Sequence, residues 1–121
     1  MWTISKYIAA GHGYLMPEVM ALLLHSQLHC AYNLSMLERN FFCSFQNKQF
    51  MLFRNDRNRA VGFVNWTFLS EDQLAKVFGA HGVVPFECWH DSGDILFFPE
   101  FIAPLGQART IVSHLRNKVF P

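Results

Sequence analysis

Hydrophobic positions along the chain fall into short runs that alternate between helical and strand-like spacing. Residues 18–32 are rich in Met, Ala and Leu and follow a proline suited to a first helical turn, which predicts a buried helix. Residues 35–46 place apolar side chains along one face of a second helix. Residues 49–54 and 60–68 are rich in Phe, Val and Trp and flank a polar turn at 55–58, which predicts an antiparallel hairpin.

The segment after the hairpin predicts a short third helix. Ser70 and Gln73 match a capping box, apolar residues then repeat at helical spacing, and Gly79 and Gly82 end the pattern. Residues 83–88 read as a further strand that a proline interrupts. This third helix therefore separates the hairpin from a second group of predicted strands.

The last third of the chain predicts a turn, a strand and a helix. Residues 91–94 have strong turn chemistry and precede the strand 95–102, which Pro104 closes. Gly106 opens an amphipathic helix whose apolar side comprises Ile111, Leu115 and Val119. The order of elements predicts a mixed α/β layer fold, and 121 residues suit a single domain spanning 1–121.

Composition narrows the function classes. The chain is 51% hydrophobic and 16% aromatic, enough for a packed core, and its net charge of +1 gives no overall field that favours nucleic acid. One basic cluster surrounds the predicted hairpin and either solvates the turn or meets an acidic protein or a phosphate. Its members are Lys48, Arg54, Arg57 and Arg59.

Cysteines and apolar runs indicate a cytoplasmic protein. Cys30, Cys43 and Cys88 are odd in number and form no CxxC pair, which argues against a disulfide framework and a structural zinc site. The longest aliphatic run, residues 19–24, is too short to cross a bilayer, and residues 1–6 do not resemble an export leader. We therefore expect neither a metal nor a membrane span.

Glu100 is the most informative polar residue, because it lies in an otherwise apolar run. A buried carboxylate costs several kcal/mol unless it has a partner or keeps its proton. An imidazolium is an economical partner, and such a carboxylate fixes the imidazole tautomer so that the other ring nitrogen accepts a proton. The alternative is that Pro99 and Glu100 form an exposed, bulged strand edge.

His29 is the candidate imidazole, and a core histidine bonded to a backbone carbonyl is its plainer interpretation. His25 precedes it by four residues, but two nitrogens form an incomplete metal shell and no HExxH pattern is present. The chain also lacks the GxSxG, GxxxxGK[ST] and GxGxxG motifs that hydrolases, nucleotide-binding and dinucleotide-binding proteins use.

Several motifs in one order resemble the toxin-activating lysine-acyltransferases, the family of the haemolysin activator. They run from about Gly11 to Pro121 and include an Asn that matches Asn40 and a closing basic stretch at 116–121. The others are Leu28-His29, Gln49-Phe50, Trp66, Leu69-Ser70, Trp89, Ser92-Gly93-Asp94 and Ile102-Ala103-Pro104-Leu105-Gly106.

The resemblance implies a GNAT-like mixed sheet with flanking helices, acyl carrier protein as the fatty-acyl donor, and lysine side chains of a toxin precursor as acceptors. We expect no cofactor. The relatives suggest a homodimer, which a Phe-rich surface permits. The family's catalytic histidine corresponds to His29, and its aspartate position is held here by Glu100. Asn40 or a backbone amide near Ser92 and Gly93 would then bind the substrate and steady the oxyanion.

Two departures from the family pattern keep other functions open. Glutamate adds a methylene to the family's aspartate and moves the carboxylate by roughly 1 Å, which matters to a positioned pair. The chain also ends near a helix after which family members often continue. One alternative is a microcin-maturation enzyme that joins a peptide C-terminus to a siderophore. Another is a scaffold that binds a carrier or toxin without catalysis.

Overall fold

The computed structural model describes residues 2–5, 16–27, 29–80, 82–89 and 93–121. Residue contacts divide the chain into two compact units, and the chain passes between them after residues 30, 50, 63 and 101. Both units contain helices and strands, so the predicted mixture of helix and antiparallel sheet is confirmed. The first unit is Met1–Cys30, Met51–Phe63 and Ile102–Pro121, and the second is Ala31–Phe50 and Val64–Phe101.

The larger sheet has four strands in the hydrogen-bonded order β1-β2-β3-β6. β2 (Phe50–Asn55) and β3 (Ala60–Asn65) form the predicted hairpin, and β1 (Trp2–Ser5) pairs antiparallel with β2. β6 is the two-residue strand Phe101–Ile102. The hairpin strands are buried on both faces, which matches their nearly continuous run of apolar residues.

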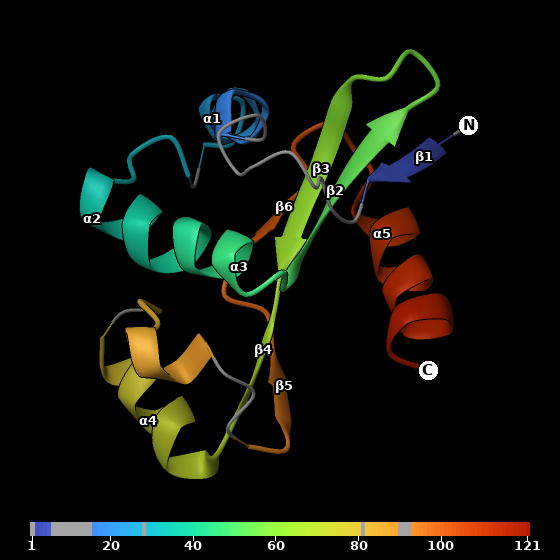
Figure 1. Ribbon diagram of the computed structural model, residues 1–121. Coiled ribbons are helices and arrows are strands. Elements are labelled where there is room, and N and C mark those ends of the chain that lie inside the picture. Colours follow the sequence, from blue (N-terminus) through green and yellow to red (C-terminus); the bar gives the residue numbers. More distant parts are fainter. Residues whose placement is uncertain (1, 6–15, 28, 81, 90–92) are drawn as a thin grey trace. The chain divides into compact units, whose positions relative to one another are not determined.

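In the first unit, α1 (Met16–Leu24) and α5 (Ala108–His114) cover opposite faces of the hairpin (Figure 1). Val61 lies beside α1 in a shared hollow, whereas its neighbour Gly62 faces Ile111 of α5. Adjacent strand residues point to opposite faces, so the two helices must lie on different sides. The helix predicted from Gly106 is confirmed, and it continues as the π-helical turn η4 (Leu115–Val119).

α1 ends at Leu24, well before the predicted end at residue 32. His25 donates its backbone N–H to Leu22 O at 3.2 Å, and Ser26 donates to Leu23 O at 3.1 Å. These tighter i to i−3 bonds replace the i to i−4 ladder and close the helix. His29 therefore lies in the turns after α1.

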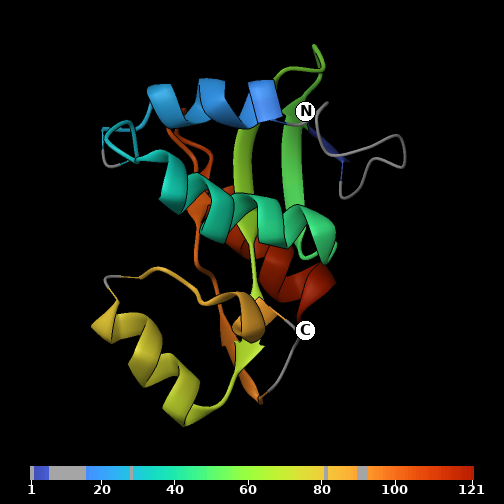
Figure 2. The ribbon, with the colours of Figure 1, turned by 60° about the vertical axis from the view of Figure 1, so that its left-hand side comes forward.

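In the second unit, residues 34–46 form one continuous helix made of α2 (Leu34–Leu37), η2 (Glu38–Phe42) and α3 (Cys43–Gln46) (Figure 2). Asn33 caps it, because its side-chain oxygen accepts the backbone N–H of Met36 at 3.0 Å. The predicted second helix is confirmed. Its middle turn, η2, is π-helical, a local widening that often occurs at functional sites.

The remainder of the second unit contains a two-stranded sheet and two further helices. β4 (Thr67–Leu69) pairs antiparallel with β5 (Ile95–Phe97), and α4 (Glu71–Gly79) begins with the predicted capping box. η3 (Phe86–Trp89) is a short 3-10 helix. One buried cluster packs these elements together and consists of Cys43, Leu69, Val77, Val84, Cys88 and Trp89.

One predicted strand is wrong and another is divided in two, and a proline explains each. Residues 83–88 do not form a strand, because Cys88 donates to Pro85 O at 3.0 Å in a turn that leads into η3. The strand 95–102 is divided into β5 and β6, which belong to different sheets. Pro99 cannot donate a ladder hydrogen bond, so the pairing stops there and frees the backbone of Glu100 for other partners.

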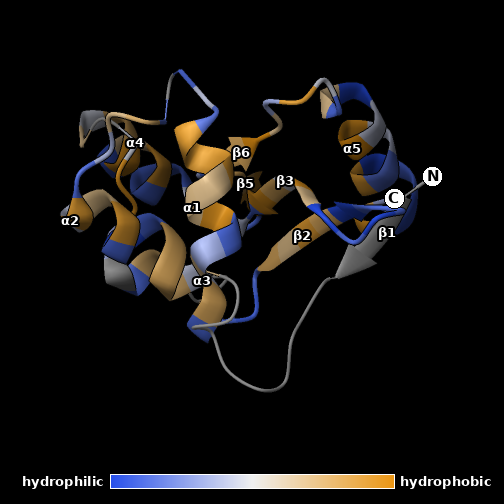
Figure 3. Ribbon diagram, turned by 90° about the horizontal axis from the view of Figure 1, so that it is seen from above, coloured by the Kyte–Doolittle hydropathy of each residue, from blue (hydrophilic) through white to orange (hydrophobic). Residues whose placement is uncertain are grey.

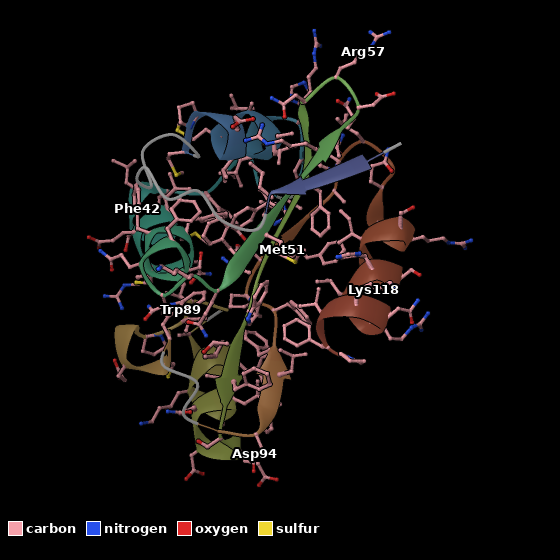
Figure 4. All side chains as sticks on the ribbon, turned by 45° about the vertical axis from the view of Figure 1, so that its right-hand side comes forward. Phe42, Met51, Arg57, Trp89, Asp94 and Lys118 are labelled. Carbon is pink, nitrogen blue, oxygen red and sulfur yellow. The ribbon has the colours of Figure 1, made fainter. Side chains whose placement is uncertain are left out.

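Arg54, one member of the predicted basic cluster around the hairpin, is buried and paired with an acidic side chain. Arg54 is only 8% exposed, and both of its terminal nitrogens donate to the Glu18 carboxylate, Nη2 to Oε1 at 2.7 Å. The hairpin turn is hydrophilic (Figure 3), and Arg57 extends outward at its tip (Figure 4). Arg57 and Arg59 are exposed turn residues, and Lys48 belongs to the second unit.

Two further findings concern the described residues. The three cysteines are free thiols, with Cys30 exposed and Cys43 and Cys88 buried. Burial raises the pKa of the Cys43 and Cys88 thiols, which keeps them protonated and unreactive. Among the helices within the described ranges, none has the length and apolar character needed to cross a bilayer.

Candidate active site

Glu100 lies in the short link between β5 and β6 and is only 2% exposed. Its backbone N–H donates to Asn65 Oδ1 at 2.9 Å, and its carbonyl accepts the Asn65 N–H at 3.1 Å. The prediction of a buried carboxylate is confirmed, and the exposed strand edge is wrong. This backbone pairing fixes the point from which the side chain extends.

Two uncharged side chains donate to the Glu100 carboxyl. Tyr32 Oη donates to Oε1 at 2.6 Å, and the Asn40 amide forms a second hydrogen bond. Burial raises the pKa of Glu100 to about 7, and the hydrogen bonds from Tyr32 and Asn40 oppose that rise by favouring the ionised form. The carboxyl therefore changes charge near neutral pH, where a side chain is best placed to move protons.

Asn40 connects Glu100 to the loop after α4. It projects from η2, its Oδ1 accepts the Val84 N–H at 3.0 Å, and its Nδ2 donates to Gly82 O at 3.1 Å. Asn40 also favours the ionised form of the Glu100 carboxyl. Asn40 is therefore a support for the carboxyl, and its oxyanion role stays a prediction.

Asn65 is a buried support of the candidate site that the sequence analysis missed. It is fully buried in β3, and its Nδ2 donates to Asn40 O at 2.5 Å and to Ser44 Oγ at 3.2 Å. Together with its bonds to the Glu100 backbone, it ties the helix to the β5–β6 link. A signal existed, because an asparagine between Val64 and Trp66 is a poor strand former in an apolar run.

His29 lies in the first unit, whereas Glu100, Asn40 and Gly93 lie in the second. The imidazole is 7% exposed, its Nδ1 shares a hydrogen bond of 2.6 Å with Ser26 Oγ, and burial lowers its pKa. A neutral ring held at Nδ1 presents Nε2 as the nitrogen that can accept a proton when Nδ1 carries the hydrogen. Ser26, which the sequence analysis did not single out, thus orients the ring.

Only Gly93 of the Ser92-Gly93 turn lies within the described residues. Ser92 lies outside the described residues, so its predicted substrate contact stays a prediction. A side chain at Gly93 would overlap the backbone of Leu69 and Ser70, which gives this glycine a packing role at the start of α4. Its backbone amide stays a predicted oxyanion donor.

Within the described ranges, no group of three or more His, Cys, Asp or Glu side chains is arranged to hold a metal ion. His25 is exposed, and its Nδ1 donates to Ala21 O at 2.8 Å at the end of α1. The first unit also has a hollow of about 490 Å³ between α1 and the hairpin. Its lining comprises Glu18, Ala21, Leu22, His25, Asn55, Arg59, Ala60, Val61 and Leu105.

The profile of the RTX toxin acyltransferase family matches residues 12–121, so the chain belongs to this family. The lysine-acyltransferase RtxC of Vibrio cholerae is 35% identical over 105 residues. The RTX-I toxin-activating lysine-acyltransferase ApxIC of Actinobacillus pleuropneumoniae is 29% identical over 104 residues. The resemblance drawn from the sequence motifs is thereby confirmed.

The matches cover most of this chain but less of its relatives. The chain aligns over 84% of its own length and 66% of the Vibrio cholerae protein, and over 86% of its length and 59% of ApxIC. The uncharacterized protein sll0720 of Synechocystis is 29% identical over 108 residues, which are 88% of this chain and 73% of that protein.

Proposed function

We propose that this chain transfers a fatty-acyl group from acyl carrier protein to lysine side chains of a protein toxin precursor. The observation that supports it best is the family match over residues 12–121, because it extends across His29, Asn40 and Glu100. Relatives named lysine-acyltransferases and toxin-activating lysine-acyltransferases support the same chemistry. The buried carboxyl with a pKa near neutrality is consistent with a proton-transfer site.

The reaction needs a base, because a lysine with a pKa of about 10.4 is mostly protonated at pH 7 and its free amine costs about 4 to 5 kcal/mol. We assign that role to His29. Burial lowers the pKa of its imidazole and keeps the ring neutral, and the bond to Ser26 orients it. A neutral imidazole within hydrogen-bond reach of the amine typically contributes about 10² to 10⁴ in rate.

In this scheme the lysine Nζ attacks the carbonyl carbon of the carrier thioester. The N–C bond forms, the C–S bond breaks, and the carrier leaves as a thiolate. The lysine ammonium first loses one proton through His29 to solvent. The second proton, released as the amine attacks, passes to Nε2 of His29 and then to the departing sulfur, so the enzyme returns to its starting state. No cofactor enters the balance.

We assign Glu100 as the acidic partner of this base. Its negative charge would stabilise the imidazolium that forms when His29 takes the proton. Ser26 already bonds Nδ1 of His29. In this scheme Glu100 therefore supports His29 through its negative charge. The hydrogen bond from the carboxylate to Nδ1 that the sequence predicted is not needed. Asn40 and Tyr32 hold the carboxylate ready for this role.

The direct test incubates the purified chain with fatty-acyl carrier protein and the toxin or peptide precursor encoded beside it. Mass spectrometry should find an acyl group on a lysine, and the gain should require the loaded carrier. A product that joins a peptide C-terminus to a siderophore without the carrier would establish the microcin-maturation alternative. Tight precursor binding without modification at any acyl length would establish the scaffold and overturn the proposal.

His29→Ala should lower acyl transfer by at least about 100-fold. His25→Ala is the matched control, since it removes an exposed histidine four residues earlier and should leave the rate within about twofold. Circular dichroism and thermal unfolding would verify that both variants fold. Equal rates for the two variants would remove His29 from the reaction.

Three broader features belong to the same proposal. We place the reaction in the cytoplasm, where free cysteines persist. We also propose the GNAT-like form of the mixed fold. A homodimer is compatible with exposed apolar side chains such as Leu24, Leu34 and Phe78, and sedimentation analysis of the pure chain would detect it.

A further inference from the structure

Tyr32 approaches Glu100 across a sequence separation of 68 residues. It lies just before α2, is half-buried, and donates from Oη to Glu100 Oε1 at 2.6 Å. Its ring packs edge-on against Phe41, with ring centroids 6.5 Å apart and an angle of 65° between the planes. Phe41 is fully buried, so this packing fixes where the hydroxyl points.

We propose that Tyr32 is a positioning residue of the acyl-transfer site, whose hydroxyl holds the Glu100 carboxylate in one orientation and favours its ionised form. The inference rests on the proposed function for the reaction, but the coupling between the two side chains is independent of it. Tyr32 acts through Glu100 and needs no contact with substrate.

The length of the contact supports this role. A separation of 2.6 Å is typical of an O–H group that donates to an ionised oxygen, which is roughly twice as strong as a neutral hydrogen bond. A glutamate side chain has more rotatable bonds than an aspartate, so a fixed donor limits more alternative positions. The phenol thus restricts the extra freedom that the longer side chain brings.

The polar groups around the Glu100 carboxyl also support the positioning role of Tyr32. Tyr32 supplies a titratable hydroxyl from the segment before α2, Asn40 supplies an uncharged amide from η2, and Asn65 of β3 bonds the Glu100 backbone. Burial raises the pKa of Tyr32, and the bond to Glu100 raises it further, so the phenol remains a donor throughout the neutral range. Tyr32 therefore cannot serve as the base.

The test is Tyr32→Phe, which keeps the ring and its packing and deletes one oxygen. Loss of the donor should move the acid limb of the pH–activity profile up by about one pH unit. Activity at pH 7 should then fall about fivefold and recover by pH 9, because the carboxyl still ionises at higher pH. An unchanged acid limb would overturn the proposal.

A readout besides activity separates this inference from the proposed function. The ¹³C chemical shift of the Glu100 carboxyl should titrate about one pH unit higher in Tyr32→Phe than in the unmodified chain. Equal midpoints would overturn the coupling. The expected shift in a chain that acylates no lysine would retain the coupling and overturn the proposed function alone.

Phe41→Leu is the control for a merely structural role. It weakens the packing of the Tyr32 ring but keeps the hydroxyl, so it should lower stability and move the acid limb less than Tyr32→Phe does. If Tyr32→Phe does not fold, the Tyr32 ¹³Cζ signal of the unmodified chain replaces it. The chemical shift of that signal should change with a midpoint near pH 7, as Glu100 ionises. A chemical shift that does not change over this range would overturn the proposal.

Discussion

Glu18 and Glu100 are two carboxylates with well-defined partners, and those partners differ in charge. In the first unit, Glu18 is 32% exposed and meets the guanidinium of Arg54 through two hydrogen bonds. In the second unit, Glu100 is 2% exposed and meets the neutral Tyr32 and Asn40. The first carboxylate thus has a cation as its partner, whereas the second has neutral donors and a pKa that burial raises to about 7.

The comparison suggests a division of roles. Charge-paired Glu18 links α1 to the hairpin and serves the fold. Glu100 costs stability whenever it is ionised in its buried position, and a fold gains nothing from that cost. A buried carboxyl kept near its ionisation point is suited to chemistry, which is the role we assign to it.

The largest expected contrast is in activity. Glu100→Gln should lower acyl transfer by at least about 100-fold, because it keeps the shape and removes the charge. Glu18→Gln should leave the rate within about threefold while lowering stability by roughly 1 kcal/mol, since Arg54 loses its charged partner. Rates measured with one loaded carrier, alongside urea unfolding, check both. Similar losses of activity in the two variants would end the division of roles.

The next contrast is the dependence of stability on pH. Glu100 has a pKa of about 7 in the folded chain against 4.5 as its ordinary value, so the folded chain holds more protons between these values. Stability should therefore fall as pH rises from 4.5 to 7, by on the order of 3 kcal/mol from this group. Urea unfolding across this range measures the slope.

Glu100→Gln should remove that slope, and Glu18→Gln should retain it. Above pH 7 the Gln variant should equal or exceed the unmodified chain in stability, because the cost of a buried charge is gone. A slope that persists unchanged in Glu100→Gln would assign it to other groups and contradict the account.

A smaller contrast compares two glycines. At Gly93 an added Cβ would overlap the backbone of Leu69 and Ser70, whereas at Gly62 it would meet the flexible end of the Ile111 side chain. Gly93→Ala should cost about 2 to 3 kcal/mol and Gly62→Ala about 1 kcal/mol, because backbone yields less than a side-chain terminus. Thermal unfolding compares them, and the reverse order would contradict the packing role of Gly93.

Local chemistry made much of the fold predictable. The capping box at Ser70 and Gln73 and the turn between β2 and β3 depend on neighbouring residues, and both are confirmed. The errors in the strands occur where a proline interrupts an apolar run, since composition favours a continuous strand that Pro85 and Pro99 prevent.

The candidate site was predictable only in part. Glu100 stands out as one charge within an apolar run, so its burial followed from the sequence. Its partners Tyr32 and Asn65 lie 68 and 35 residues away, and their hydrogen bonds depend on tertiary structure that no local pattern encodes. The pairing of Glu100 with His29 stays a prediction.

The titration of Glu100 itself tests the central claim most directly. Selective ¹³C labelling of glutamate, with the signal assigned through Glu100→Gln, would follow its carboxyl from pH 4 to 9. A buried carboxyl held by neutral donors should titrate at about 7. A midpoint at or below 4.5, the ordinary value, would show a carboxylate that is permanently charged and would contradict the account.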